Sequence, residues 1–199
     1  VSIGAGGGSI VSLEPRTNVP RVGPQSAGAK PGPVCYGFGG TEPTLTDVMT
    51  LIGYMEPEHF LGGTITLDTE AARTVFQNKI AEPMGMSVEE AAFGIYRVAA
   101  AQITDLIHEI TVDRGLDPRD FVLHAFVCSC PLLAGVFGKE LNVQRIMSTP
   151  IFSASSSNHI ALPLDLCISS PFSSRIKAYV KTFLAGRESS STAAITINE

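Results

Sequence analysis

The 199-residue sequence contains no tryptophan, and aromatic residues make up only 7% of it. It also has no run of Lys or Arg, and its net charge is -5 at neutral pH. Proteins that hold a nucleic-acid backbone carry clustered positive charge, so nucleic acid is not the expected partner. The longest apolar stretches, residues 131–138 and 160–164, are much shorter than the roughly 18 residues that indicate a membrane-spanning helix. We therefore expect a protein that does not enter a membrane.

Cysteine is also sparse, with four residues: Cys35, Cys128, Cys130 and Cys167. These are too few for the dense disulfide framework of a small secreted domain, so we expect a reducing, cytoplasmic location. The chain begins with Val1 and shows no signal-peptide pattern, which indicates a fragment of a longer product. The hydrophobic fraction of 44% is that of an ordinary globular protein with one sizeable core or two small ones.

Glycine and proline interrupt the first 45 residues so often that long helices are excluded there. Two short strands, at residues 10–13 and 21–22, are expected on either side of a polar turn. Before them, the glycine-rich run from Gly4 to Ser9 offers consecutive unhindered amides that can form a nest for an anion. It is not a Walker loop, because no Gly-Lys-Ser/Thr follows. Taken alone, a flexible turn without a ligand explains this run equally well.

Helical spacing of apolar residues begins near residue 46. A short helix is expected there, with Thr46 or Asp47 as its N-cap. A second helix should start at Asp68 and stop at Pro83 and Gly85. Asp47 has two interpretations, as a substrate or metal ligand and as a helix cap, and the pattern does not separate them.

The strongest helical signal begins at Ser87, which forms a capping box with Glu90. An apolar stripe with 3/4 spacing then continues as far as a stop at Gly115. Many of its residues are small, which favours close packing against another backbone, so we expect this helix in the core. Ile95 lies in the middle of the stripe.

A strand, a helix and a second strand are expected after this helix, at residues 121–127, 131–141 and 143–147. The first strand is a nearly continuous apolar run, which is typical of a buried parallel strand. A strand–helix–strand order implies a right-handed crossover and an α/β sheet. We therefore expect three parts: a Gly/Pro-rich segment of loops and short strands (1–45), a helix-rich α/β lobe (46–150), and a divergent C-terminal segment with a frayed tail (151–199).

Three stretches of the sequence, residues 3–10, 21–37 and 39–47, resemble the hydantoinase A/oxoprolinase family. This family includes N-methylhydantoinases, 5-oxoprolinases and the subunits of acetone and acetophenone carboxylases. The resemblance continues through residues 97–99 and 114–131, so it covers most of the chain.

The resemblance implies an α/β fold, the second lobe of an actin-like ATPase, which is a ribonuclease H-like fold. It also implies an enzyme that uses ATP and Mg to phosphorylate an amide or ketone oxygen, since a carbonyl oxygen leaves poorly until it is phosphorylated. The family's two Asp- and Gly-rich phosphate loops precede the matched segment. The implied partner is therefore an N-terminal lobe of the same family or a larger subunit, in a hetero-oligomer.

The family also has a Phe-Gly-Gly-Ala-Gly-Pro turn after a buried strand, where the glycine backbone underlies adenosine. Residues 126–131 of this sequence read Phe-Val-Cys-Ser-Cys-Pro instead, and residues 152–159 depart from a second glycine-containing stretch. These changes indicate a degenerate nucleotide site. The resemblance implies nucleotide-binding positions at Gly4, Gly6, Gly7, Gly8, Ser9 and Ser129, with Val127, Cys128 and Cys130 forming the altered turn.

Other candidate site residues carry weaker signals. Cys128 and Cys130 have a C-x-C spacing without a second pair, which is a poor signature for zinc or redox chemistry. Lys30 stands where the family commonly has an acidic residue, and it receives no catalytic role. Three interpretations remain: part of an ATP-dependent enzyme, a non-catalytic scaffold of the same fold, and a redox or metal module built on the two cysteines.

Overall fold

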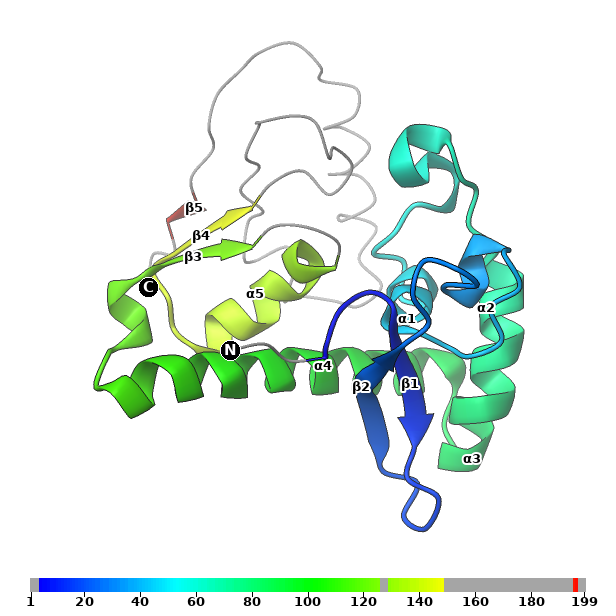
Figure 1. The fold of residues 1–199 in the computed structure, drawn as a ribbon, viewed down its shortest axis with the longest axis horizontal. Helices are drawn as coiled ribbons and strands as arrows, with labels where there is room; N and C mark the ends of the chain where they lie inside the picture. Colours follow the sequence, from blue (N-terminus) through cyan, green and yellow to red (C-terminus); the bar gives the residue numbers. More distant parts are fainter. Residues whose placement is uncertain (1–3, 126–128, 149–194, 197–199) are drawn as a thin grey trace. The chain divides into compact units, whose positions relative to one another are not determined.

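The computed structural model describes residues 4–125, 129–148 and 195–196. The chain divides into two compact units, Val1–Gln102 (unit 1) and Ile103–Glu199 (unit 2). The helix α4 (Val88–Thr111) is continuous across this division (Figure 1). Within the described ranges, no helix combines the length and apolar character needed to cross a membrane.

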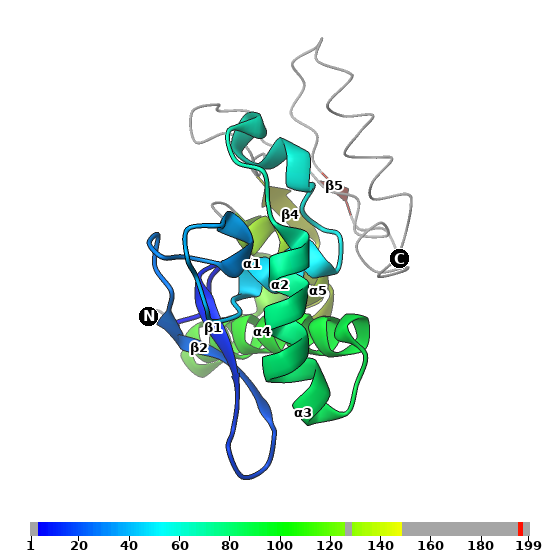
Figure 2. The same ribbon diagram turned by 90° about the vertical axis from the view of Figure 1, so that its right-hand side faces the viewer.

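Unit 1 begins with an antiparallel hairpin of β1 (Ser9–Leu13) and β2 (Pro20–Ser26). Val11 pairs with Val22, and both side chains are buried, which explains why this register is favoured. Asn18 has a left-handed backbone in the connecting turn, and its side-chain amide donates to the carbonyl of Pro83. The hairpin loop projects away from α1 and α2 in both views (Figures 1 and 2). The predicted pair of short strands is confirmed.

The first α-helix, α1 (Leu45–Leu51), is buried along its whole length. It does not begin where the sequence pattern suggested, because the N-cap is Thr44 rather than Thr46 or Asp47. Thr44 has an extended backbone, and it forms a capping box with Asp47 at the third helical position. A 3-10 turn, η1 (Val34–Tyr36), packs near the start of this helix. A second 3-10 segment, η2 (Pro57–Gly63), follows α1 in the chain.

The next helix, α2 (Thr69–Phe76), begins at the predicted N-cap, where the Asp68 carboxylate accepts from the amide of Ala71 at 2.9 Å. Gly85 ends this helical segment as expected, but Pro83 does not stop it, which corrects that part of the expectation. The chain widens into a π-helix, η3 (Gln77–Ala81), and continues as α3 (Glu82–Met84) up to Gly85. A proline ring clashes with the carbonyl four residues earlier in an α-helix, and the wider turn accommodates it.

The capping box predicted at the start of α4 is confirmed. The Ser87 amide donates to the Glu90 carboxylate at 3.2 Å, and the Glu90 amide donates to the Ser87 hydroxyl at 3.3 Å. The Ser87 hydroxyl and, to a smaller extent, the Ser87 amide donate to the Glu90 carboxylate and hold the pKa of Glu90 below its ordinary value. Ile95 is fully buried, so the first half of the helix packs into the core as expected. After the helix, the 3-10 turn η4 (Val112–Arg114) ends at Gly115 in a left-handed conformation.

Unit 2 contains a small sheet with the order β3-β4-β5. Its strands are β3 (Val122–Ala125), β4 (Arg145–Ser148) and β5 (Ile195–Thr196). β3 and β4 are parallel and joined by α5 (Cys130–Glu140), which confirms the strand–helix–strand prediction, whereas β5 is antiparallel to β4. The 3-10 turn η5 (Pro118–Asp120) precedes β3.

The helix α5 packs against β3 and β4 (Figure 1). Gly138 allows this close approach, because a Cβ at this position would overlap the Ile146 side chain. The expected full burial of β3 is wrong. Leu123 is half-buried and Ala125 is buried, but Val122 and His124 alternate with them and are exposed. The rest of the expected C-terminal segment, apart from residues 195–196, lies outside the described residues.

Candidate functional site

The glycine-rich turn of residues 4–9 is braced from within by Ser9. The Ser9 hydroxyl donates to the carbonyl of Gly4 at 3.0 Å and accepts from the amide of Gly6 at 2.8 Å. The Ser9 amide also donates to the carbonyl of Gly6 at 2.9 Å. Because Ser9 is buried and its hydroxyl proton is used inside the turn, its observed role is to hold the turn in shape. Any anion at this turn would therefore meet glycine backbone first.

Two distant segments fix the glycine-rich turn in place. The amide and the hydroxyl of Thr46 both donate to the carbonyl of Gly7, at 2.8 and 2.9 Å. On another side, Gly23 approaches Gly4 so closely that a Cβ at position 23 would overlap the Gly4 carbonyl oxygen, and its φ of 69° is itself unfavourable for other residues. The structure thus joins the turn to the N-terminal end of α1, where Asp47 lies.

Asp47 is completely buried and surrounded by hydrogen-bond donors of the protein. One carboxylate oxygen accepts from the amides of Val34 (3.2 Å) and Thr44 (2.8 Å) and from the Thr44 hydroxyl (2.8 Å). The other oxygen accepts from the amide of Cys35 at 2.7 Å. Both oxygens of this carboxylate are therefore engaged by donors of the protein. In this arrangement Asp47 ties η1 to the start of α1.

Cys35 is a buried thiol beside this carboxylate. Burial raises the pKa of Cys35 far above its ordinary value, and the negative charge of Asp47 and its hydrogen bond raise it further. The thiolate is the nucleophilic form of cysteine, so Cys35 is chemically inert at neutral pH.

We expect Cys35 to resist alkylation by iodoacetamide at neutral pH as long as unit 1 is folded. The half-buried Cys130 serves as the internal comparison and should be modified much faster. Peptide mapping by mass spectrometry gives the two rates, and the difference should disappear in denaturant. Equal rates in the folded protein would contradict the buried, protonated state of Cys35.

The second candidate region is the turn from β3 into α5, which belongs to unit 2. Ser129 is the N-cap of α5 and is buried, but its side chain makes no capping hydrogen bond. Its carbonyl accepts from the amides of Leu132 and Leu133 in the first helical turn. Pro131 occupies a favourable position at the helix start, and Cys130 beside it is half-buried. The remaining candidates of this turn, Val127 and Cys128, lie outside the described residues.

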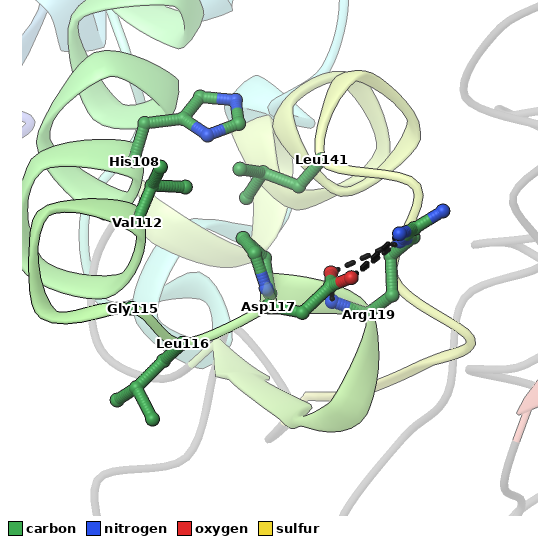
Figure 3. Close-up of a pocket in the computed structure, with 8 residues that line it drawn as sticks. His108, Val112, Gly115, Leu116, Asp117, Arg119 and Leu141 are labelled. Carbon is green, nitrogen blue, oxygen red and sulfur yellow. Dashed lines mark hydrogen bonds and ion pairs between the residues drawn. The ribbon is translucent and has the colours of Figure 1, made fainter.

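A surface pocket in unit 2 was not anticipated from the sequence. It has a volume of about 400 Å³, and its lining consists of His108, Val112, Gly115, Leu116, Asp117, Pro118, Arg119 and Leu141 (Figure 3). Arg119 donates to both carboxylate oxygens of Asp117, with its Nε at 2.9 and 3.0 Å and its Nη2 at 2.6 Å. This pairing lowers the pKa of Asp117 to about 2. At neutral pH the negative charge of Asp117 and the positive charge of Arg119 are therefore paired with each other on this wall of the pocket.

The only signal for this pocket in the sequence was the Asp117-Pro118-Arg119 turn that follows the helix stop. Turn residues of this kind are common, so the pattern alone does not indicate a pocket. Across the described ranges, no three His, Cys, Asp or Glu side chains gather closely enough to hold a metal ion.

Comparison with known proteins gives a family match over most of the chain. The family model described as hydantoinase/oxoprolinase matches residues 1–162. The alpha subunit of caprolactamase from Pseudomonas jessenii is 49% identical over 122 residues, which cover 61% of this chain and 17% of that protein. The gamma subunit of acetophenone carboxylase from Aromatoleum aromaticum is 38% identical over 159 residues, which cover 79% of this chain and 22% of that protein.

A solved structure shows the same similarity at the level of the fold. The chain superimposes on the nucleotide-free structure of acetone carboxylase, which was solved to explain ATP-dependent acetone carboxylation. The TM-score is 0.69 and the sequence identity is 30%. The superposition covers 75% of this chain and 21% of that chain. The chain therefore spans about a fifth of the length of the relatives it matches.

Proposed function

The chain belongs to the hydantoinase/oxoprolinase family, and on this basis we propose that it forms part of an ATP-dependent enzyme that activates an amide or ketone carbonyl by phosphorylation. The observation that carries the proposal is the family match over residues 1–162, which includes the glycine-rich turn, Asp47 and the β3–α5 turn. Relatives named as a caprolactamase subunit and as a ketone carboxylase subunit support both classes of substrate.

In this proposal, ATP supplies the phosphoryl group that turns the carbonyl oxygen into a leaving group. The residues of this chain contribute positioning. Gly6, Gly7 and Gly8 present backbone that is only half-buried, and the space beside Gly6 is open, which suits contact with a phosphate oxygen. Thr46 and Ser9 keep this backbone fixed before the ligand arrives, so little ordering is needed on binding.

Magnesium accompanies ATP in phosphoryl transfer, but the described residues do not fit the role of a metal site. They contain no cluster of three potential ligands, and both carboxylate oxygens of Asp47 are buried and accept hydrogen bonds from the protein. We assign no metal-dependent step to them. The same reasoning makes Asp47 a positioning residue, which holds η1 against the start of α1.

The rest of the active site is proposed to come from a partner: the N-terminal lobe of the same family or a larger subunit, in a cytoplasmic hetero-oligomer. The naming of the relatives as subunits supports this view. A second candidate function is a scaffold of the same fold with a degenerate nucleotide site. The altered sequence of the β3–α5 turn, at positions 127, 128 and 130, favours it.

The enzyme function requires the native assembly to bind ATP, whereas the scaffold function predicts that it binds ATP poorly because of the altered turn. Replacing Val127, Cys128 and Cys130 by glycine removes three Cβ atoms from the turn that underlies adenosine in the resembling family. Overpacking costs about 1 to 3 kcal/mol per site, and about 1.4 kcal/mol changes affinity tenfold. We therefore expect the triple glycine variant to bind ATP about 100-fold more tightly than the wild type by calorimetry.

The matched control replaces the same three residues by serine, which keeps every Cβ atom and should leave the affinity for ATP unchanged. A glycine variant that folds, judged by circular dichroism, and gains no affinity would argue against adenosine at this turn. Micromolar ATP binding by the chain alone would contradict the need for a partner.

A further inference from the structure

A second turn, residues 26–32, is attached to the glycine-rich turn of residues 4–9 in unit 1. The amide of Ala27 donates to the carbonyl of Gly8 at 2.9 Å. The two turns also meet at the side of Gly8, because a Cβ at this position would lie 2.9 Å from the Ser26 hydroxyl oxygen. A larger residue in place of Gly8 would therefore displace Ser26, and the glycine allows the two turns to lie in contact.

Hydrogen bonds within the second turn hold its shape. The Ser26 hydroxyl accepts from the amide of Gly28 at 3.1 Å, and the amide of Gly32 donates to the carbonyl of Ala27 at 3.2 Å. Gly28 has a φ of 64°, which glycine adopts more readily than other residues. The bond between Gly32 and Ala27 closes a short loop that contains Lys30. Because Ala27 is also bonded to Gly8, the base of this loop is fixed to the glycine-rich turn.

Lys30 brings a positive charge to this loop. Its side chain is exposed, and within the described ranges it belongs to none of the ion pairs, which involve Arg21, Arg73, Lys79 and Arg119. A lysine has a flexible four-carbon stem and three N–H donors, so its ammonium group can extend beyond its own loop toward a neighbouring one. The charge of Lys30 is thus available to a ligand at the adjoining glycine-rich turn.

The glycine-rich turn uses its carbonyls inside the protein and leaves amides unused. The carbonyls of Gly4, Gly6, Gly7 and Gly8 all accept hydrogen bonds, from Ser9, Thr46 and Ala27. The amides of Gly7 and Gly8, in contrast, have no acceptor among the described residues. Both glycines are only half-buried. What remains for a ligand is a pair of consecutive donors, which suits an anion and does not suit a cation.

We propose that Lys30 and the amides of Gly7 and Gly8 together bind an anionic oxygen group, which is either a phosphate of ATP or a carboxylate of the substrate. The inference deepens the proposed function and rests on it, since that proposal places a phosphate oxygen at the glycine backbone. Lys30 adds the charge that the backbone lacks. Hydrogen bonds from an ammonium group to a charged oxygen are about twice as strong as those between neutral groups. Lys30 is therefore a binding residue.

The test titrates the full 199-residue chain with inorganic phosphate and, separately, with acetate, and follows the backbone amides by NMR. We expect the amide signals of Gly7 and Gly8 to shift on addition of one of these anions, and binding to weaken with added salt. Lys30→Gln should weaken binding about tenfold or more, whereas Lys30→Arg keeps the charge and should retain it. Arg16→Gln is the matched control. It removes the same charge from an exposed residue beyond the opposite end of β1 and should have no effect.

A shift with phosphate assigns the site to a phosphate group, and a shift with acetate alone assigns it to a carboxylate. Three outcomes would overturn the proposal: no shift of Gly7 and Gly8 with either anion, unchanged binding in Lys30→Gln, or an equal loss in Arg16→Gln. ATP binding is measured separately on the native assembly. An assembly that binds no ATP, while the chain still binds an anion through Lys30, rejects the proposed function and leaves the anion site intact.

Discussion

Replacing Asp47 by alanine is expected to lower the free energy of unfolding by about 4 kcal/mol or more, a loss that few single substitutions cause. The substitution leaves three buried amides and one buried hydroxyl without their acceptor. Each buried group that loses its partner costs about 1 to 3 kcal/mol. Denaturant unfolding followed by circular dichroism measures the change.

Asp68→Ala is the matched control for this experiment. Asp68 also stands at the start of a helix, but its single capping contact, with the amide of Ala71, is exposed. Loss of an N-cap of this kind costs about 1 kcal/mol. If Asp47→Ala were no more destabilising than Asp68→Ala, the buried network around Asp47 would not have the role described above.

The second large effect is expected for Ile95→Asp, which should abolish cooperative unfolding. Ile95 is fully buried on α4 between the equally buried Ala91 and Ala99. An acid placed there must either lose its hydration as a carboxylate or take up a proton and remain buried as a polar group, and either cost is comparable with the whole stability of an ordinary domain. Thermal melting by circular dichroism should show a broad, weak transition in place of a sharp one.

Gly94→Ala provides the adjacent control. A Cβ at position 94 meets open space, and alanine favours a helix over glycine, so this variant should gain about 0.5 to 1 kcal/mol of stability. The two substitutions are one residue apart, and their effects on the free energy of unfolding should have opposite signs. A sharp transition for Ile95→Asp would show that this face of α4 is not part of the core.

Local signals predicted the N-terminal caps of α2 and α4. The Ser87–Glu90 box and the Asp68 cap need only residues three positions apart, so the pattern contains all the information. The box of Thr44 and Asp47 has the same spacing, but it follows a Gly/Pro-rich segment and was missed in favour of the later threonine. Pro83 was misjudged because the π-helix that accommodates it has no signature in the sequence.

Burial and long-range anchoring could not be predicted from local pattern. The apolar run of β3 correctly indicated a strand, but whether it is covered depends on neighbours that the strand's own sequence does not specify. The glycine-rich turn was recognised from its composition. Its attachment through Thr46 and Gly23, and the amides of Val34 and Cys35 that donate to Asp47, involve residues that are distant in sequence.

The contact between Thr46 and Gly7 also constrains the order of events during protein synthesis. The two residues are 39 positions apart, and the glycine-rich turn leaves the ribosome first. At about 5 to 20 residues per second, translation delivers Thr46 about 2 to 8 s after Gly7. The turn therefore exists for seconds as nascent chain without the anchor that shapes it, and only the completed start of α1 makes it a preformed surface.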